Sequence, residues 1–357
     1  MIVHGSVYSY YTGKLEAYLR WKGLAYRRVP MTVHDFERRV PRATGAAQMP
    51  AVELPDGRWM TDTTPIIEWL ERVHPEFAVV PHDPLQAFAS RLLEDYADEW
   101  LWRPAMHYRW SYRADAALRS RGLAEEMLAG IVAPPPLKRW LMRRRQFGRF
   151  VRGDGVAGAT RQHVEGVYLR TLAALETIVV ARPYLLGEVP TLADFGFFGS
   201  MFRHFALDPT PGAIMRERAP AVHAWVARLW NARAEHGGDI LDDVPGDWAP
   251  LLDDVGSAYL PYLCANADAH AAGRRRFDVT VQDTTYRRVP VSRYRVWCLE
   301  RLRRHYEALG DGDRVAARAL LERHGCWEPL WRVRAPRSGY DPEGRAPFGP
   351  GLGVFAR

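Results

Sequence analysis

The order of strand and helix patterns in the first 75 residues restricts the folds open to this chain more than any other feature. Short apolar runs bounded by turn residues predict strands, and apolar residues spaced three and four apart predict helices. The predicted elements are, in order, a strand (1–7), a helix (14–23), a strand (25–32), a hairpin (49–61) and a helix (64–73). A β-α-β-β-β-α order in so short a span predicts a small mixed sheet with few helices.

The rest of the chain has mainly helical patterns. Residues 85–230 are helical in pattern almost throughout, and 92–110 has the pattern of one aromatic-rich helix with a kink at Pro104. Thr191 and Asp194 have the spacing of a shortened capping box at a helix start. We therefore expect an α+β domain (1–75), a linker (76–84), an all-helical domain (85–248) and a C-terminal extension (249–357). The extension is mainly helical in pattern, with a β-hairpin pattern at 277–291 and an irregular Gly/Pro-rich tail from about 335.

The composition is that of a globular protein in a reducing compartment. Hydrophobic residues make up 47% and charged residues 25% of the 357 residues, which is typical of soluble domains. The cysteines, Cys264, Cys298 and Cys326, have no CxxC spacing, which argues against a disulfide framework. The N-terminus lacks the pattern of a signal peptide, and no run approaches the roughly 18 apolar residues of a membrane span. We expect a cytoplasmic protein without a membrane span.

The net charge of +7 raises the question of an anionic partner. Residues 138–152 contain seven basic residues and no acidic one. The aromatic residues interleaved with them are limited to Trp140, Phe147 and Phe150, whereas single-stranded nucleic acid favours many stacking platforms. We therefore expect a solvated arginine face here, and no nucleic-acid partner.

A cluster of hydroxyl groups, the segment YSYYT at 8–12, lies where the first strand gives way to a helix. The N-terminus of a helix carries a partial positive charge of about +0.5, which favours anions, including a thiolate. A hydroxyl group in this loop can donate a hydrogen bond to such a thiolate and lower its pKa. The segment therefore fits an enzyme that activates the thiol of a bound molecule. The alternative is that these tyrosines are only core and surface aromatics beside the first helix.

Two further segments fit a peptide-like thiol. Pro50 precedes a strand, and a cis bond there would expose the backbone of Met49 as an edge for pairing with a ligand. In TDTTPII (61–67), threonines cap a helix whose N–H groups suit a carboxylate, while Asp62 suits an ammonium group. A thiol anchor, a backbone edge and an amino-acid clamp, in that order, describe the tripeptide glutathione.

These segments resemble the thioredoxin-like N-terminal domain of the glutathione transferase superfamily. The segment RPYLLGEVPTLADFGFFG (182–199) resembles a signature of that family's all-helical C-terminal domain, in which the aspartate of the capped helix has structural importance. The resemblance covers roughly residues 1–235. The extension is similar to that of some uncharacterised, atypical bacterial members. The resemblance implies a thioredoxin-like domain followed by a helical domain.

The resemblance also implies which hydroxyl group activates the thiol. Cysteine-type members have a cysteine followed by proline where this chain has Ser9 and Tyr10, so thiol–disulfide chemistry would lack its nucleophile. Tyr8 stands five residues before Gly13, like the tyrosine of tyrosine-type members, and Ser9 suits the serine type. We favour Tyr8 slightly over Ser9 as the catalytic residue. Tyr11 and Thr12 are weaker alternatives.

The remaining site residues follow by the same analogy. Met49 and Pro50 would lie beside the cysteinyl part of glutathione, and Asp62 and Thr63 at its γ-glutamyl end. Tyr11 and Lys14 are further candidates for glutathione binding; Lys14 stands near the position where many members have an arginine. An aromatic pocket for a flat electrophile would be formed by Tyr10, Trp102, Met106, His107 and Tyr108. The alternative is that this aromatic helix is domain-interface core. His324 and Cys326 lack partners at metal-binding spacing, so we predict no metal.

The resulting prediction is a glutathione transferase-like enzyme. The thiolate of glutathione would attack a small apolar or aromatic electrophile by addition or displacement. Superfamily members are usually dimers, so the resemblance also implies a homodimer. The first alternative is a non-catalytic binding or structural protein with the same fold. The second is a polyanion-associated protein that uses residues 138–152.

Overall fold

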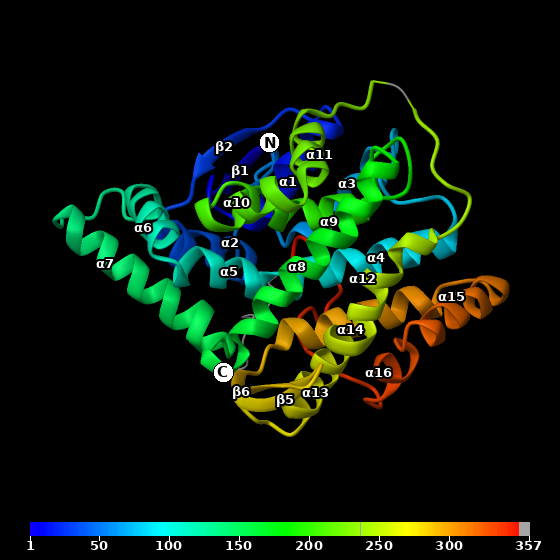
Figure 1. The fold of residues 1–357 in the computed structure, drawn as a ribbon. Helices are drawn as coiled ribbons and strands as arrows, with labels where there is room; N and C mark the ends of the chain where they lie inside the picture. The colour runs from blue at the N-terminus through cyan, green and yellow to red at the C-terminus, as the bar shows by residue number, and fades with distance from the viewer. Residues whose placement is uncertain (236, 350–357) are drawn as a thin grey trace.

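The computed structural model describes residues 1–235 and 237–349 (Figure 1). The N-terminal sheet consists of β1 (Ile2–Gly5), β2 (Arg27–Pro30), β3 (Ala51–Glu53) and β4 (Trp59–Thr61). The strand order is β2-β1-β3-β4, with β1 parallel to β2 and antiparallel to β3, and with β3 antiparallel to β4. The predicted mixed sheet is therefore confirmed.

Helices α1 (Tyr10–Trp21) and α3 (Thr63–Val73) pack against each other beside this sheet. The predicted order omitted a helical segment between β2 and β3, formed by the turn Asp35–Arg39 and α2 (Val40–Thr44). The turn buries none of its residues, so it has no apolar stripe from which a helix could be recognised. The strand–helix order is thus β-α-β-α-β-β-α.

The following segment is helical, as predicted. Its helices are α4 (Pro84–Glu99), α5 (Trp102–Ser111), α6 (Arg113–Met127), α7 (Pro135–Gln146), α8 (Gly158–Ala181), α9 (Leu192–Ser200), α10 (Pro209–Arg218) and α11 (Pro220–Asn231), with short helical turns at Phe147–Val151, Arg152–Asp154 and Met201–Ala206. The predicted single helix 92–110 is wrong, because α4 ends and α5 begins anew. Pro104 lies in the first turn of α5, where a missing N–H group costs no hydrogen bond.

Helix α9 connects the two parts of the molecule, because it packs against both α1 and α4. Its capping box is confirmed: the backbone N–H of Thr191 donates to Asp194 Oδ2 at 2.9 Å. Asp194 Oδ1 also accepts a hydrogen bond from the backbone N–H of Leu185 at 3.0 Å. The buried aspartate therefore ties the preceding loop to the start of the helix.

The extension contains the predicted hairpin and helices. Its elements are α12 (Ala249–Asp254), α13 (Leu260–Ala271), β5 (Arg276–Val281), β6 (Thr284–Pro290), α14 (Arg293–Glu307), α15 (Asp311–Arg323) and α16 (Trp327–Trp331), with turns at Gly246–Trp248 and Val255–Tyr259. Helices α14 and α15 pack against α4. The chain then returns to the sheet, where the carbonyl of Pro347 accepts a hydrogen bond from the N–H of Thr61 at 3.1 Å.

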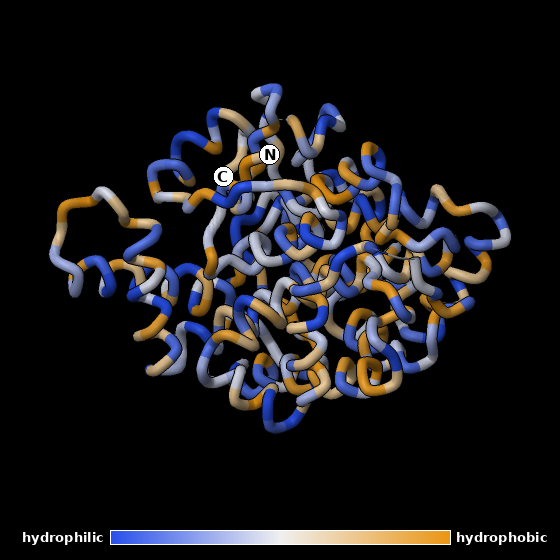
Figure 2. The backbone as a smooth tube through the Cα atoms, turned by 90° about the horizontal axis from the view of Figure 1, so that it is seen from above, coloured by the Kyte–Doolittle hydropathy of each residue, from blue (hydrophilic) through white to orange (hydrophobic). Residues whose placement is uncertain are grey.

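One cluster of buried apolar side chains extends from Val3 to Val333, so the predicted domain boundaries stay a prediction. Figure 2 shows an arm that projects from the body where α6 is followed by α7, and Ile131 and Val132 are exposed there. Among the described residues, no helix combines the length and apolar character needed to cross a membrane.

Candidate glutathione and electrophile site

A cavity of about 490 Å³ lies where the sheet domain, the helices α4 to α7 and the extension meet. The loop before α1, the segment before β3 and the start of α3 contribute one side. Helices α4 and α5 and the end of α7 contribute the second side, and residues around the start of α14 the third. The residues of the second and third sides lie far in sequence from those of the first side, so much of the cavity comes from distant segments.

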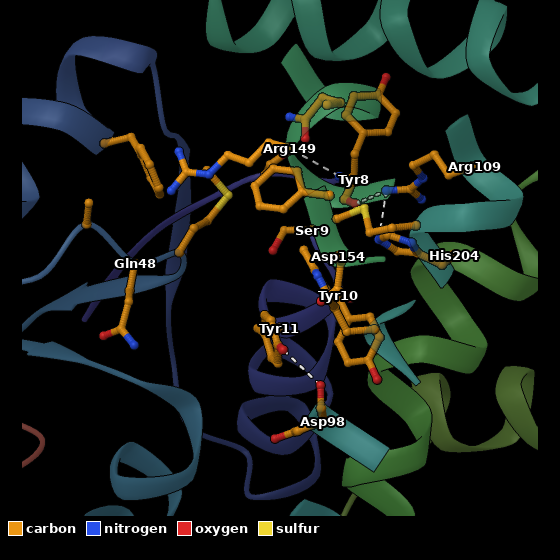
Figure 3. A pocket seen from close by; sticks show the side chains of 18 of the residues that line it. Tyr8, Ser9, Tyr10, Tyr11, Gln48, Asp98, Arg109, Arg149, Asp154 and His204 are labelled. Carbon is orange, nitrogen blue, oxygen red and sulfur yellow. Dashed lines mark hydrogen bonds between the residues drawn. The ribbon is translucent and has the colours of Figure 1, made fainter. Parts of the chain in front are cut away.

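Ser9 is the N-cap residue of α1. Its backbone is extended, and its Oγ accepts a hydrogen bond from the N–H of Thr12 at 3.2 Å. Figure 3 shows its hydroxyl group pointing into the cavity. Since Oγ acts as an acceptor toward the helix, its own proton can be donated to an anion in the cavity. The positive end of the helix dipole would stabilise the same anion.

Tyr8 turns its side chain away from this point. In Figure 3 its ring and the Ser9 hydroxyl point to different sides. The hydroxyl group of Tyr8 lies against α6 so closely that a Cβ atom at Gly122 would come within 2.2 Å of it. The geometry therefore does not support the preference for Tyr8 as the residue that activates the thiol. The hydroxyl group at the start of α1 is that of Ser9. The catalytic role of either residue stays a prediction.

Tyr10 and Tyr11 form part of the cavity wall, with their hydroxyl groups already engaged. Tyr10 is buried and donates to the carbonyl of Ala97, and Tyr11 donates to the carbonyl of Asp98 at 2.9 Å. Burial raises the pKa of both phenols well above the ordinary value. Tyr11 stacks on Trp102 with ring centroids 5.9 Å apart. Two of the clustered hydroxyls thus anchor the loop to α4.

The segment before β3 forms the edge next to Ser9. The Met49–Pro50 peptide bond is cis, as the sequence predicts. Met49 and Pro50 both line the cavity, together with Gln48.

Asp62 lies at the far end of the same side, immediately before α3. It has a left-handed φ of 71°. Its Oδ1 accepts a hydrogen bond from the hydroxyl of Tyr294 at 3.1 Å. Its Oδ2 is buried and has no hydrogen-bond partner among the described residues. Burial raises the pKa of this carboxyl to about 7. Thr63, the first residue of α3, lines the cavity beside it.

Lys14 is not available for ligand binding, which corrects the prediction. It is fully buried, and its Nζ lies 2.5 Å from both Glu94 Oε1 and Asp98 Oδ2. Thr64 Oγ1 is 3.4 Å from the same Nζ. Because Lys14 faces α3 and α4 and not the cavity, its charge neutralises a buried acidic pair between the domains.

Helix α5 contributes only one face to the cavity. Trp102 and Met106, which lie four residues apart, line it as predicted. His107 and Tyr108 do not, and this prediction is wrong. His107 bonds to Glu165 Oε1 on α8 at 2.9 Å, and Tyr108 packs edge-on against Tyr168 at 5.2 Å. Consecutive helical residues point about 100° apart, so the three residues 106–108 cannot share one face.

Metal binding has no visible support in the described part of the chain. No group of three or more His, Cys, Asp or Glu side chains there is arranged to hold an ion. The absence of a metal stays a prediction.

Comparison with protein families decides the assignment. The family described as glutathione S-transferase, N-terminal domain, matches residues 8–73, and glutathione S-transferase, C-terminal domain, matches residues 158–228. Residues 8–73 and 158–228 thus match the two domains of the glutathione S-transferase family.

The chain is also similar to several solved structures. The beta-etherase LigF from Sphingobium sp. strain SYK-6 is 24% identical, with 65% of this chain and 95% of that chain covered and a TM-score of 0.46. A glutathione S-transferase from Methylobacterium radiotolerans, in complex with glutathione sulfonate, is 22% identical, with 67% and 98% covered and a TM-score of 0.40. Maleylpyruvate isomerase from Pseudomonas aeruginosa PAO1 is 19% identical, with 68% and 100% covered and a TM-score of 0.34. Comparison with curated protein sequences gave no match.

Several cavity residues lie outside both matched glutathione S-transferase segments, and sequence reasoning missed them. Arg145 and Arg149, at the end of α7 and in the turn after it, line the cavity. The expectation that the run 138–152 is only a solvated face is therefore wrong for Arg145, which is partly buried, whereas Arg149 is exposed and also lines the cavity. The extension contributes Tyr294 and Arg295. The spacing of four residues between Arg145 and Arg149, which places them on one face of a helix, was the one sequence signal for this pair. No sequence pattern connects the extension with Asp62.

Proposed function

We propose that this glutathione S-transferase superfamily member is a glutathione-dependent enzyme whose bound thiolate attacks an apolar or aromatic electrophile. The observation that supports this most is the hydroxyl group of Ser9, which faces the cavity from the N-cap position of α1. The domain that contains it matches the glutathione S-transferase N-terminal domain.

The chain offers a partner for each group of glutathione. Ser9 and the N–H groups of α1 would stabilise the sulfur as a thiolate, and the thiol proton would pass to solvent. Met49 would lie beside the peptide backbone. The unpartnered Oδ2 of Asp62 would accept hydrogen bonds from the α-ammonium group. Thr63 and the N-terminus of α3 would hold the α-carboxylate.

The electrophile would lie against the apolar wall of α5. Trp102 and Met106 lie on this wall, and Phe150 meets Trp102 edge-on at 5.5 Å. The sulfur would form a bond to the electrophilic carbon. In a displacement, the bond between that carbon and the leaving group would break, and its electron pair would depart with the leaving group. In an addition, the electron pair of the π bond would move to the neighbouring atom, which would then take a proton from solvent. Holding both reactants together and lowering the pKa of the thiol would supply the rate gain.

Titration with glutathione, combined with turnover of a chromogenic aryl halide, tests this function. We expect saturable binding, an ultraviolet thiolate band at neutral pH, and turnover. No binding at millimolar glutathione would overturn the proposal.

A non-catalytic binding protein is the second candidate. One observation favours it: Asp62 Oδ1 already accepts a hydrogen bond from Tyr294 of the extension. This leaves fewer carboxylate oxygens for the γ-glutamyl end of glutathione. Glutathione binding without turnover of any electrophile in a broad panel would support it. The homodimer and the cytoplasmic location stay predictions.

A further inference from the structure

Two arginines at the end of α7 line the cavity without a function in the chemistry above. Arg145 lies in the last turn of α7 and is partly buried, and Arg149 lies one turn further along. Figure 3 shows the side chain of Arg149 reaching toward the side of the cavity that contains Gln48. Both arginines line the cavity.

Two further arginines that line the cavity, Arg109 and Arg295, are neutralised by carboxylates. Arg109 Nε lies 2.7 Å from Asp208 Oδ2, and Arg295 Nε lies 3.0 Å from Glu99 Oε2. Arg145 differs from these two: within residues 1–235 and 237–349, no ion pair includes it. Its pKa is lowered by burial and by the charge of Arg149, and only Glu37 acts in the opposite direction. An anion bound here would relieve this unfavourable electrostatic environment.

Three of the acidic residues that line the cavity have basic partners elsewhere. Asp98 is paired with Lys14 at 2.5 Å, Asp154 with Arg103 at 3.1 Å, and Glu99 with Arg295 at 3.0 Å. None of these three carboxylates forms an ion pair with Arg145.

A second polar group lies between the two arginines in sequence. Gln146 lines the cavity and is only 6% exposed, and its Oε1 has no hydrogen-bond partner among the described residues. Its Nε2 has only a weak contact with the sulfur of Met142, at 3.6 Å. The amide of Gln146 therefore retains hydrogen-bonding capacity toward a bound group.

We propose that Arg145, Arg149 and Gln146 form a carboxylate-binding site in the cavity. This inference rests on the proposed function. The carboxylate has two possible sources, an acid group on the electrophile or the glycyl carboxylate of glutathione. In the first case the substrates are aromatic or apolar electrophiles that bear a carboxylate, with the apolar body against Trp102 and the acid at Arg145. In the second case the same arginines orient the thiol donor.

A two-by-two set of reactants separates these sources. The electrophiles are 4-chloro-3-nitrobenzoate and its neutral amide; the thiols are glutathione and its glycine amide. The variants are Arg145→Gln and Arg149→Gln, with Arg143→Gln as the matched control, since Arg143 is exposed on the same helix and does not line the cavity. Unfolding curves of all three variants would check that the fold is intact.

If the electrophile supplies the carboxylate, the cavity variants should lose about tenfold or more in kcat/KM with the benzoate but not with its amide. If glutathione supplies it, the loss should appear as a raised KM for glutathione and vanish with the glycine amide. Arg143→Gln should behave as wild type in both cases. An equal loss with all four combinations, or no loss in any, overturns the carboxylate site.

A binding measurement without glutathione distinguishes failure of the carboxylate site from failure of the proposed function. Binding of 4-chloro-3-nitrobenzoate is followed without glutathione by quenching of the tryptophan fluorescence, since Trp102 and Trp110 line the cavity. If the wild type never turns over glutathione but binds the benzoate at least about tenfold more tightly than Arg145→Gln does, the function fails and the site stands. If turnover is normal and neither binding nor kcat/KM depends on the arginines, the function stands and the site fails.

Discussion

Replacement of Asp62 by asparagine tests the electrostatics of the γ-glutamyl end. Asparagine has nearly the same shape, tolerates the left-handed φ of 71°, and its amide oxygen can still accept the hydrogen bond from Tyr294. The substitution therefore removes the charge and leaves the local packing in place. Its effects on stability and on binding should have opposite signs.

The stability effect follows from the pKa of Asp62. Burial raises this pKa to about 7 in the folded protein, whereas an unfolded aspartate titrates at about 3.9. Between these values the folded state binds more protons, so the stability contributed by Asp62 is complete below about pH 4 and is lost as pH rises to about 7. The difference of about 3 between the folded and unfolded pKa values corresponds to at most about 4 kcal/mol in the free energy of unfolding. Because the residue is partly exposed, solvent screening should reduce this to about 2 kcal/mol.

Urea unfolding between pH 4 and pH 8 measures the effect. Asp62→Asn should match the wild type near pH 4 and exceed it by about 2 kcal/mol near pH 8. Asp243→Asn, at an exposed position, is the control and should follow the wild type throughout. Parallel curves for wild type and Asp62→Asn, or a less stable variant at pH 8, would refute the reasoning.

Glutathione binding should change in the other direction. A hydrogen bond to a charged group contributes about 1.5–3 kcal/mol, so the variant should bind at least about tenfold more weakly at pH 8. The affinity of the wild type should also fall below pH 7, because the ammonium group needs the ionised carboxylate. If stability shifts as expected and affinity does not, Asp62 is buried but does not hold the ammonium group.

Four further substitutions test the remaining roles. Ser9→Gly, which keeps most of the N-cap stability, should raise the pKa of the bound glutathione thiol by about 1–2, because it removes a hydrogen bond to the thiolate. Tyr8→Phe should leave this pKa unchanged. The absorbance of the thiolate as a function of pH measures both pKa values, and a larger effect of Tyr8→Phe would assign the role to Tyr8. Lys14→Met should lower the free energy of unfolding in urea by about 3–5 kcal/mol, because it leaves Glu94 and Asp98 buried without a counter-charge. A loss below about 1 kcal/mol would show that Lys14 does not neutralise these two carboxylates. Tyr294→Phe removes the hydroxyl group that donates a hydrogen bond to Asp62, so it should weaken glutathione binding about fivefold while the secondary structure stays unchanged. An unaltered affinity would mean that the extension does not position the carboxylate of Asp62.

Local sequence predicts the features that depend on neighbouring residues. The strands, the capping box of Thr191 and Asp194, and the cis peptide bond before Pro50 are each decided within a few residues, and each is confirmed. The hydroxyl at the start of α1 belongs to this group in part. Sequence spacing places both Tyr8 and Ser9 there, but only the packing of the Tyr8 ring against Gly122 separates them.

Tertiary contacts decide the features that sequence reasoning misses. Lys14 appears suited to a ligand until Glu94 and Asp98, eighty residues away, are seen to surround it. His107 and Tyr108 adjoin Met106 in sequence but face α8. Charge and aromatic content indicate that such residues matter, and only the arrangement of helices shows to which neighbour each one is turned.

In the proposed function, thiol recognition and electrophile recognition come from different parts of the chain. Ser9, Met49 and Asp62 lie within the segment that matches the N-terminal family domain, whereas Arg145 and Tyr294 lie outside both matched segments. Changes in α7 and in the extension would then alter which electrophile fits without altering the start of α1. Tyr294 is the exception, because it connects the extension to Asp62 across 232 residues of sequence. A change in the extension that moved this tyrosine would thus alter both halves of the site, which makes Tyr294→Phe the substitution that best tests whether the two are coupled.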